Sequence, residues 1–386
     1  MQRQARRIAI LVDTSTGWGR RVIRGAANYA LKQGGWQITV EERGINEPMA
    51  LPADWHGDGV IVRVNTLKLH QALSDLGIPV VNVSGIELQG VDLPRVTSDY
   101  NSIAELAVSH FLQRGFHHLA YCGLENLAYV ERHRRAFENA AKDRAMSCHS
   151  YRPASKGKSN SWQHQRGALI KWIEGLPKPA GILTWDSTRA RNVLNACLEA
   201  GIMVPEQVAV LAGDDDELLC ETTTPPLSAI VTPAERIGHE AARILHEMMD
   251  GTPPPRDDVL LRADELHTRG STDTLAIKDQ AVVMAVRHIR ENIQSPSLQV
   301  ADIAALAGIS RRALERRFHK LFGYGPAHEI QSTRCQLVRK LLRETDLSIA
   351  DLASRTGYAS QEYMIRAFKK DAGTTPLKYR RRIRGR

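Results

Sequence analysis

The carboxy-terminal part of the chain contains an internal repeat whose two copies are offset by 49 to 50 positions. The first copy is marked by Ile303-Ala304, Gly308, Phe318, Gly323 and Pro326, and the second by Leu352-Ala353, Gly357, Phe368, Gly373 and Pro376. In each copy an alanine lies four residues before a glycine, which is the spacing needed where one helix packs a small side chain against the next across a tight turn. The repeat therefore predicts two helix-turn-helix units in tandem.

A polar and basic segment follows the turn glycine in each unit, with apolar residues four apart on its other face. We predict that Leu314 and Phe318 are core residues, as are Met364 and Phe368. The opposite face supplies the candidate DNA contacts, which are Ser310, Arg311, Arg312, Glu315, Arg316, Ser360, Gln361, Glu362 and Arg366. Arginine can bind guanine bidentately, glutamine can pair with adenine, and glutamate can accept from cytosine. Contact with phosphates alone, or a solvated face without a binding role, remains open for each of them.

Charge is distributed unevenly along the chain. Residues 280–386 hold 21 Lys or Arg against 9 Asp or Glu, whereas the whole chain holds 52 against 43. A basic module beside a near-neutral body is typical of a protein in which one part binds a polyanion and the other does not. Within the basic module, the helical pattern over residues 327–344 spans roughly 26 Å and would hold two recognition helices about 34 Å apart on one face of duplex DNA.

The first 275 residues alternate short apolar runs with longer amphipathic stretches, a pattern typical of a doubly wound α/β sheet. The predicted strands are Ile8–Val12, Trp36–Glu41, Gly59–Val62, Val80–Val83, His118–Cys122, Gly181–Thr184 and Val208–Ala212. In such folds ligands bind beyond the carboxyl ends of the strands. Those ends carry carboxylates, hydroxyls and indoles but no basic phosphate cradle, as in Asp13-Thr14-Ser15-Thr16-Gly17-Trp18 and Thr184-Trp185-Asp186.

The cysteines and the amino terminus indicate the compartment. The five cysteines are widely spaced and include no Cys-x-x-Cys pair, which favours reduced thiols. The apolar run that follows the basic amino terminus is too short for a signal peptide, and no stretch approaches the length of a membrane span. We therefore expect a cytoplasmic protein.

Several segments carry family resemblances. Residues 208–217, followed by 224–230 and 235–242, resemble the effector domain of the lactose-repressor group, which is itself similar to periplasmic sugar-binding proteins. The carboxy-terminal repeat, with its closing Pro376 to Arg380, resembles the arabinose-regulator class of activators. The two parts in this order are similar to xylose-type regulators over nearly the whole chain.

The resemblance implies a domain organisation and partners. A two-lobed, periplasmic-binding-protein-like α/β sensor would occupy residues 1–275, and an all-α DNA-binding domain residues 276–386, with helix-turn-helix motifs at 299–319 and 348–370. Lobe 1 would comprise residues 6–113 and 233–259 and lobe 2 residues 114–232 and 260–275, with crossovers near Arg114–His117, Ile230–Pro233 and Leu260–Ala263. A sugar effector between the lobes, a homodimer formed through the sensor, promoter DNA and RNA polymerase are the implied partners, and no cofactor or metal is implied.

The strand ends supply most of the candidate sugar contacts. Asp215 lies where the resemblance places a carboxylate against sugar hydroxyls, although a turn or N-cap role is the alternative. Trp18 and Trp185 would each cover the apolar face of a pyranose, or else pack in the core. Ser15 shares the loop of Trp18, and Asp186 and Arg189 follow Trp185.

One candidate region departs from the family pattern. Where the group has an arginine four residues before an aromatic residue, here Phe137, this chain has His133, with Arg132 and Arg134 beside it. Either Arg132 takes the role through a shift, or the pocket prefers a different pattern of hydroxyls. Arg132 and His133 are both candidates, and the identity of the sugar stays open.

The sequence offers no positive sign of catalysis. Gly17-Trp18-Gly19 imitates a dinucleotide-binding motif, but Val22 stands in place of the third glycine and four polar residues separate Gly17 from the strand. No nucleophile elbow, zinc-protease motif or clustered Cys/His set occurs. We predict a sugar-responsive transcription activator of pentose catabolism genes and not an enzyme. A doubly wound nucleotide-dependent enzyme and a DNA binder that ignores sugars are the competing hypotheses.

Overall fold

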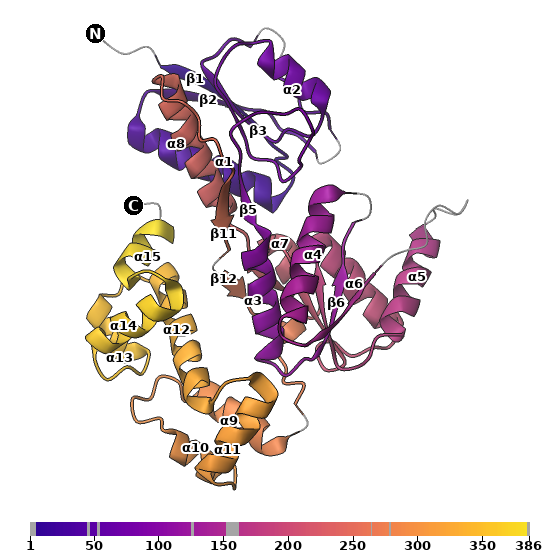
Figure 1. The fold of residues 1–386 in the computed structure, drawn as a ribbon, viewed down its shortest axis with the longest axis vertical. Coiled ribbons are helices and arrows are strands. Elements are labelled where there is room, and N and C mark those ends of the chain that lie inside the picture. Colours follow the sequence, from indigo (N-terminus) through magenta and orange to yellow (C-terminus); the bar gives the residue numbers. More distant parts are fainter. Residues whose placement is uncertain are drawn as a thin grey trace. The chain divides into compact units, whose positions relative to one another are not determined.

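The protein forms two compact units. One unit is made of Met1–Phe111 with Phe116–Thr274, and the other of Leu112–Gly115 with Leu275–Arg386 (Figure 1). The computed structural model describes residues 5–44, 47–51, 55–124, 127–151, 162–263, 265–277 and 279–383. None of the helices in these ranges is both long enough and apolar enough to cross a membrane. The larger unit contains both lobes of the predicted sensor, and the smaller one contains the repeat.

The first lobe is built on a parallel four-stranded sheet with the order β2-β1-β3-β4. Its strands are β1 (Arg6–Leu11), β2 (Trp36–Val40), β3 (Gly59–Val62) and β4 (Val80–Asn82). Side chains alternate across β1, so that Ile8 and Ile10 belong to one hydrophobic cluster while Ala9 and Leu11 belong to another. Both faces of this sheet are therefore buried, which explains why its strands are continuous apolar runs.

Helices α1 (Gly17–Gln33) and α8 (Ala234–Met249) cover one face of this sheet, and α2 (Leu67–Ser74) contributes to the cluster on the other. The two long helices touch through glycines. A Cβ on Gly25 would lie 1.8 Å from the carbonyl oxygen of Glu235, and one on Gly238 would lie 1.9 Å from that of Val22. Only glycine allows this approach, which brings the amino-terminal helix against a segment more than 200 residues later in the chain.

The second lobe contains a six-stranded sheet with the order β12-β10-β9-β8-β6-β7. Its strands are β6 (His118–Cys122), β7 (Ser147–Ser150), β8 (Ala180–Thr184), β9 (Val208–Ala212), β10 (Ser228–Val231) and β12 (Glu265–His267). All pairings are parallel except that of β10 with β12. The helices of this lobe are α3 (Tyr100–Leu112), α4 (Ala128–Lys142), α5 (Trp162–Glu174), α6 (Ser187–Glu199) and α7 (Glu217–Glu221).

The chain passes between the lobes three times, and the first passage differs from the prediction. Strand β5 (Val96–Asp99) pairs with β11 (Val259–Arg262), and α3 follows at once. Helix α3 already packs on the second sheet, because a Cβ on Gly181 of β8 would lie 2.5 Å from the Phe111 ring. The first crossover is therefore at Asp99–Tyr100 and not at Arg114–His117. The second follows β10, and the third follows β11.

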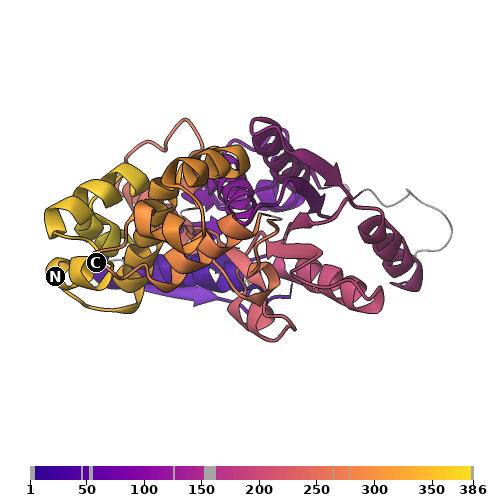
Figure 2. The same ribbon diagram turned by 90° about the horizontal axis from the view of Figure 1, so that it is seen from below.

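The smaller unit consists of α9 (Gln280–Glu291), α10 (Val300–Leu306), α11 (Arg311–Phe322), α12 (Pro326–Glu344), α13 (Ile349–Arg355), α14 (Gln361–Ala372) and α15 (Pro376–Ile383). The predicted helix-turn-helix units are α10–α11 and α13–α14. Their second helices begin at matching serine caps and end at Gly323 and Gly373, which adopt φ values of 79° and 68°. Figure 2 shows the helices of the first helix-turn-helix unit (orange) and those of the second helix-turn-helix unit (yellow) as two neighbouring groups.

Candidate functional site

A cavity of about 200 Å³ lies between the two lobes, at the carboxyl ends of their strands. The first lobe contributes Asp13, Thr16, Trp18, Arg63, Gly85, Ile86, Thr97 and Ser98. The second contributes Tyr100, Ile103, Leu124, Tyr129, His133, Trp185, Asp186, Gly213, Asp214 and Thr232. The cavity therefore lies where the fold class predicts a ligand site.

Aromatic rings form much of the cavity wall, with Trp185 at their centre. Its ring centroid is 5.2 Å from those of Tyr129 and His133 and 6.2 Å from that of Tyr100, all in edge-to-face arrangements. Trp18 adds an indole from the first lobe. Aromatic faces cover the C–H side of a sugar ring well, while polar groups bind its hydroxyls. Of the residues predicted to contact the ligand, Trp18, His133, Trp185 and Asp186 line this cavity.

Asp13 is a lining carboxylate that was not among the predicted ligand contacts. It is buried, and its Oδ2 lies 3.1 Å from Nη1 of Arg63. Its Oδ1 is buried as well and has no hydrogen-bond partner elsewhere in the described residues. Burial raises the pKa of Asp13, and the Arg63 guanidinium opposes that rise. A buried acceptor without a partner is costly. Because Asp13 also lines the cavity, its carboxylate is a candidate acceptor for a ligand hydroxyl.

Asp214 also lines the cavity and joins the two lobes. Its Oδ1 lies 2.7 Å from Nη2 of Arg21 on α1 and accepts a hydrogen bond of 3.0 Å from the Thr232 hydroxyl. Burial raises the pKa of Asp214, whereas Arg21 lowers it. Asp214 therefore lines the cavity, whereas the sequence favoured its neighbour Asp215 as the ligand carboxylate.

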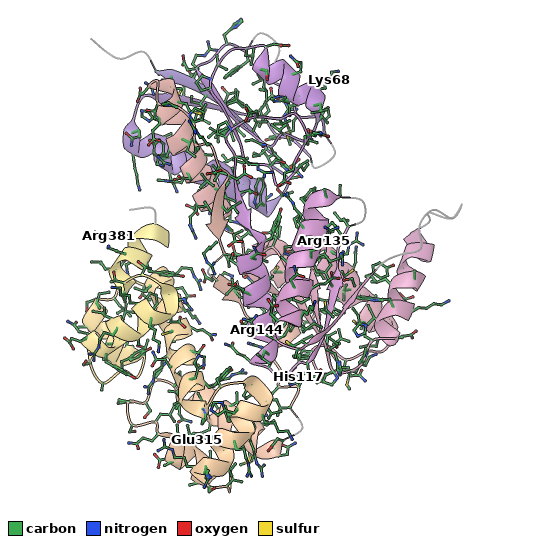
Figure 3. The ribbon with its side chains drawn as sticks, in the orientation of Figure 1. Lys68, His117, Arg135, Arg144, Glu315 and Arg381 are labelled. Carbon is green, nitrogen blue, oxygen red and sulfur yellow. The ribbon has the colours of Figure 1, made fainter. Side chains whose placement is uncertain are left out.

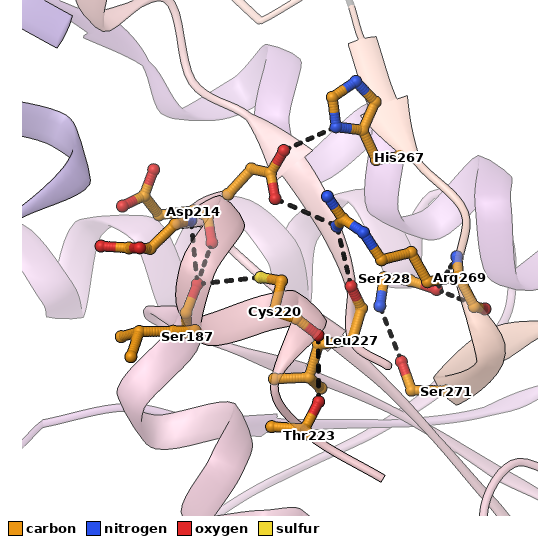
Figure 4. A network of polar contacts seen from close by, with 12 residues as sticks. Ser187, Asp214, Cys220, Thr223, Leu227, Ser228, His267, Arg269 and Ser271 are labelled. Atoms are coloured by element: carbon orange, nitrogen blue, oxygen red, sulfur yellow. Dashed lines mark hydrogen bonds and ion pairs between the residues drawn. The ribbon is translucent and has the colours of Figure 1, made fainter. Parts of the chain in front are cut away.

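Both carboxylate oxygens of Asp215 already have side-chain partners. Oδ2 lies 2.6 Å from Nδ1 of His267, and Oδ1 lies 3.0 Å from Nη1 of Arg269, the two partners that Figure 4 labels. Burial alone would raise the pKa of Asp215, but His267 and Arg269 lower it below its ordinary value. Asp215 is not among the lining residues. Asp215 forms an ion pair with Arg269 that ties the loop after β9 to the segment after β12, and it does not lie in the cavity lining where the prediction would place it.

Three other predicted contacts lie outside the lining. Ser15 is exposed, and its backbone N–H donates to the carbonyl oxygen of Arg43. The backbone N–H of Arg189 donates to Oδ1 of Asp186, which caps α6. Arg132 donates to the carbonyl oxygen of Gly85 and pairs with Glu87, so it links α4 to the first lobe without facing the cavity.

Gly17 and Gly19, which resemble part of a dinucleotide-binding motif in the sequence, are explained by close packing. A Cβ on Gly19 would lie 1.9 Å from the carbonyl oxygen of Asp13, and one on Gly17 would lie 2.9 Å from Oδ2 of Asp216. The backbone N–H of Gly17 also donates to that carboxylate oxygen over 3.0 Å. Gly19 thus allows close packing within the loop after β1, and Gly17 allows that loop to approach Asp216 of the second lobe.

His133 is a neutral group in the cavity wall. It is 1% exposed, and its Nδ1 lies 2.8 Å from the Tyr121 hydroxyl. Burial lowers the pKa of His133 from 6.5 to about 3. The imidazole is therefore uncharged at neutral pH, which distinguishes this pocket from one with the arginine that the resemblance implies at this position.

The His133→Gln substitution is expected to reduce the pH dependence of stability. Because the folded-state pKa of about 3 lies below the unfolded value of 6.5, the unfolded chain binds this proton first as the pH falls. The stability that depends on a neutral His133 is complete above pH 6.5 and is lost toward pH 3, by about 1.4 kcal/mol per unit at most. Urea unfolding of both chains at several pH values measures the difference in slope. Equal slopes for the wild type and His133→Gln would contradict a neutral buried imidazole.

The predicted DNA contacts lie on the outer faces of α11 and α14. Leu314, Phe318, Met364 and Phe368 are fully buried, as predicted. All of the candidate contacts are exposed except Glu315, which is half-buried on α11 and lies 2.9 Å from Nε of Arg311 (Figure 3). Ser310 and Ser360 cap their helices, since each hydroxyl oxygen accepts from a backbone N–H over 3.2 Å. A DNA phosphate could still accept from either hydroxyl.

One exposed aromatic side chain on α14 was overlooked in the sequence analysis. Tyr363 is 47% exposed and lies between Gln361 and Arg366 along the same outer face. Its ring also packs edge to face against the ring of Tyr358, with the two centroids 5.8 Å apart. A phenol at this position can donate to a phosphate or contact a base edge.

Comparison with known proteins covers the whole chain. Profiles of three families match it, namely the XylR N-terminal domain over residues 7–101, a periplasmic binding protein-like domain over residues 108–272 and a helix-turn-helix domain over residues 286–382. The structure of CcpA from Lactococcus lactis shares the sensor fold, with a TM-score of 0.54 and 17% identity over 70% of this chain and 100% of that one.

Similarity to full-length relatives is higher. The xylose operon regulatory protein of Escherichia coli strain K12 is 30% identical over 97% of this chain and 96% of its own length, and that of Haemophilus influenzae is 28% identical over 98% and 99%. A solved structure described as the xylose-binding transcription activator xylR is 29% identical and superposes with a TM-score of 0.64, covering 98% of this chain and 99% of that one. The chain therefore belongs to the family of xylose operon regulatory proteins.

Proposed function

We propose that this protein is a transcription activator that binds an uncharged pentose, D-xylose first among the candidates, in the cavity between its lobes. The observation that carries the proposal is the cavity between the lobes, in which the carboxylate of Asp13 lies among the rings of Trp18, Trp185 and Tyr129. Such a site provides an acceptor for a hydroxyl and faces for a sugar ring. The name of the solved xylose-binding relative supports the choice of sugar.

The charges of the lining also favour a neutral ligand. Three carboxylates, Asp13, Asp186 and Asp214, line the cavity, against the guanidinium of Arg63. His133 adds no positive charge at neutral pH because burial lowers its pKa. A sugar phosphate or an aldonic acid would meet like charge in a partly dehydrated site.

Ligand binding would act through the contacts that close the lobes on each other. Arg21 of the first lobe reaches Asp214 of the second, and Arg132 of the second lobe reaches Gly85 and Glu87 of the first. A sugar that touches both walls binds the closed arrangement more tightly than an open one and so shifts the equilibrium toward it. We propose that the protein acts in the cytoplasm as a homodimer whose geometry changes when the sensor closes. This change would alter the affinity for promoter DNA and the contact with RNA polymerase.

D-Xylose is expected to stabilise the full chain against heat. A ligand at a hundred times its Kd adds about 2.7 kcal/mol to the free energy of unfolding. Differential scanning fluorimetry should therefore show a higher Tm with D-xylose, while xylonate and xylose 5-phosphate, the charged controls, should leave the Tm unchanged. A screen in which no pentose or hexose raises the Tm would overturn the proposed sugar response.

A further inference from the structure

The two helix-turn-helix units have separate hydrophobic cores. One cluster includes Ile303, Leu314 and Phe318, and a second includes Leu352, Met364 and Phe368. Helix α12 contributes to both, through Ile330 to the first and through Val338 and Leu342 to the second. We call the two parts the first and second subdomains. If α12 alone joined them, bending or twisting of one helix would change the distance between α11 and α14.

A buried arginine joins the subdomains beside this helix. Arg334 on α12 is 8% exposed, and its Nε and Nη2 donate to the carbonyl oxygens of Ile293 and Ser295 over 3.3 and 2.7 Å. Both carbonyls belong to the segment that connects α9 to α10 in the first subdomain. The guanidinium also lies 5.6 Å from the ring centroid of Tyr358, which follows the turn of the second subdomain. One cation therefore holds backbone from one side and an aromatic face from the other.

The turn glycine of the second subdomain takes part in the same contact. Gly357 has a φ of 75°, and a Cβ placed on it would lie 2.4 Å from the carbonyl oxygen of Ile293 and 3.0 Å from Nε of Arg334. The equivalent residue of the first copy, Gly308, has a φ of 67°, but no described atom lies within 4 Å of a Cβ placed there. The repeat thus contains one glycine needed only for its backbone conformation and one that is also needed for contact between subdomains.

Tyr358 differs from its counterpart in the same way. The first copy of the repeat has Ile309 at this position, which packs at the edge of its own core. In the second copy the Tyr358 hydroxyl accepts from Nε2 of Gln331 over 3.2 Å and lies 3.3 Å from Sγ of Cys335, both on α12. These contacts hold the Tyr358 ring against the guanidinium of Arg334.

We infer that Arg334, Gly357 and Tyr358 form a clamp that fixes the distance and the angle between recognition helices α11 and α14. Arg334 is then a positioning residue, which acts on DNA through these helices without touching it. Successive major grooves on one DNA face are one helical turn, or about 10 base pairs, apart, so inserting one base pair rotates the second site by roughly 34°. Two recognition helices that are held rigidly avoid the entropic cost of ordering the second helix on DNA. They also bind more weakly to a duplex in which the spacing of the half-sites is wrong.

The clamp is tested first without DNA. Nitroxide labels on Lys320→Cys and Lys370→Cys, two exposed positions on α11 and α14, report their separation in the full chain, with Cys148→Ser removing the partly exposed native thiol. We expect a narrow distance distribution that broadens at least twofold in Arg334→Met. The matched control is Arg339→Met, because Arg339 lies on the same helix and pairs with Asp371 inside the second subdomain. An unchanged width in Arg334→Met would overturn the inference, as would equal broadening in the control.

The repeat supplies a second matched pair in case Arg334→Met does not fold. Gly357→Ala and Gly308→Ala carry the same backbone strain, but only the former pushes on Ile293. On the duplex that the wild-type chain selects from a random library, we expect the wild type and Gly308→Ala to lose about tenfold in affinity per inserted base pair between the half-sites. Gly357→Ala should lose less than threefold, and an identical spacing profile in both variants would contradict the clamp. The inference uses the proposed DNA binding only here, so a wild type that selects no duplex would overturn the proposed function and leave the label distances to decide on the clamp.

Discussion

Asp13→Asn is expected to weaken D-xylose binding by about 10- to 150-fold. A hydrogen bond to a charged group contributes about 1.5–3 kcal/mol, and about 1.4 kcal/mol corresponds to a factor of ten. The amide has the shape of the carboxylate but only one acceptor oxygen. If that oxygen faces Arg63, an N–H group takes the place of the unpartnered Oδ1. Isothermal titration calorimetry of the two chains measures the loss directly.

Asp215→Asn is the matched control for this substitution. Asp215 is as buried as Asp13 and also pairs with an arginine, but it does not line the cavity. The substitution should lower thermal stability, because His267 and Arg269 lose a charged partner, while the Kd for D-xylose changes by less than about threefold. A result in which Asp215→Asn abolishes binding and Asp13→Asn does not would restore the assignment made from the sequence.

Raising the salt concentration from about 50 to 200 mM is expected to weaken DNA binding by about 10³- to 10⁵-fold, if six to ten phosphates are contacted. The outer faces of α11 and α14 carry Arg311, Arg312, Arg316 and Arg366, all exposed, and each phosphate contact releases bound counterions. Fluorescence anisotropy with a labelled duplex gives the slope of log Kd against log salt.

Sugar binding should respond differently to the same salt. An uncharged pentose releases no counterions, so its Kd should change by less than about twofold over this range. A salt slope for DNA near zero would mean that the basic faces of α11 and α14 do not meet phosphates. A steep slope for the sugar would mean that the ligand is charged.

Local sequence signals were enough to predict the repeat and most of the central strands. Strands β3, β6 and β9 have the predicted bounds, because a short buried apolar run between turn residues fits a parallel strand and little else. The caps at Ser310 and Ser360 and the positive φ at Gly323 and Gly373 depend on neighbouring residues only. Such features can be predicted without knowledge of the tertiary contacts.

Features that depend on distant contacts were missed. Strands β5, β11 and β12 are only three or four residues long, and none has a continuous apolar run of more than three residues. Pairing between distant segments therefore makes them strands. Helix α3 has an amphipathic pattern that does not reveal which sheet it covers, which displaced the first crossover.

In the acidic loop after β9, too, contacts with distant residues decide a feature that the local sequence does not reveal. In the series Asp214, Asp215 and Asp216, the distant Arg21, His267 and Gly17 determine which carboxylate faces the cavity, and none of them is near in sequence. Asp13 could have been found, since it directly follows a buried strand. Its unpartnered oxygen depends on the position of Arg63, which the sequence does not give.

We propose that occupancy of the cavity between the lobes sets the affinity of the helix-turn-helix units for DNA. The affinity of the full chain for its selected duplex, measured by anisotropy with and without saturating D-xylose, tests it most directly. Coupling between two sites commonly amounts to 1–3 kcal/mol, so we expect the two Kd values to differ by about 5- to 150-fold. Identical Kd values, under conditions in which calorimetry shows D-xylose bound, would contradict the account.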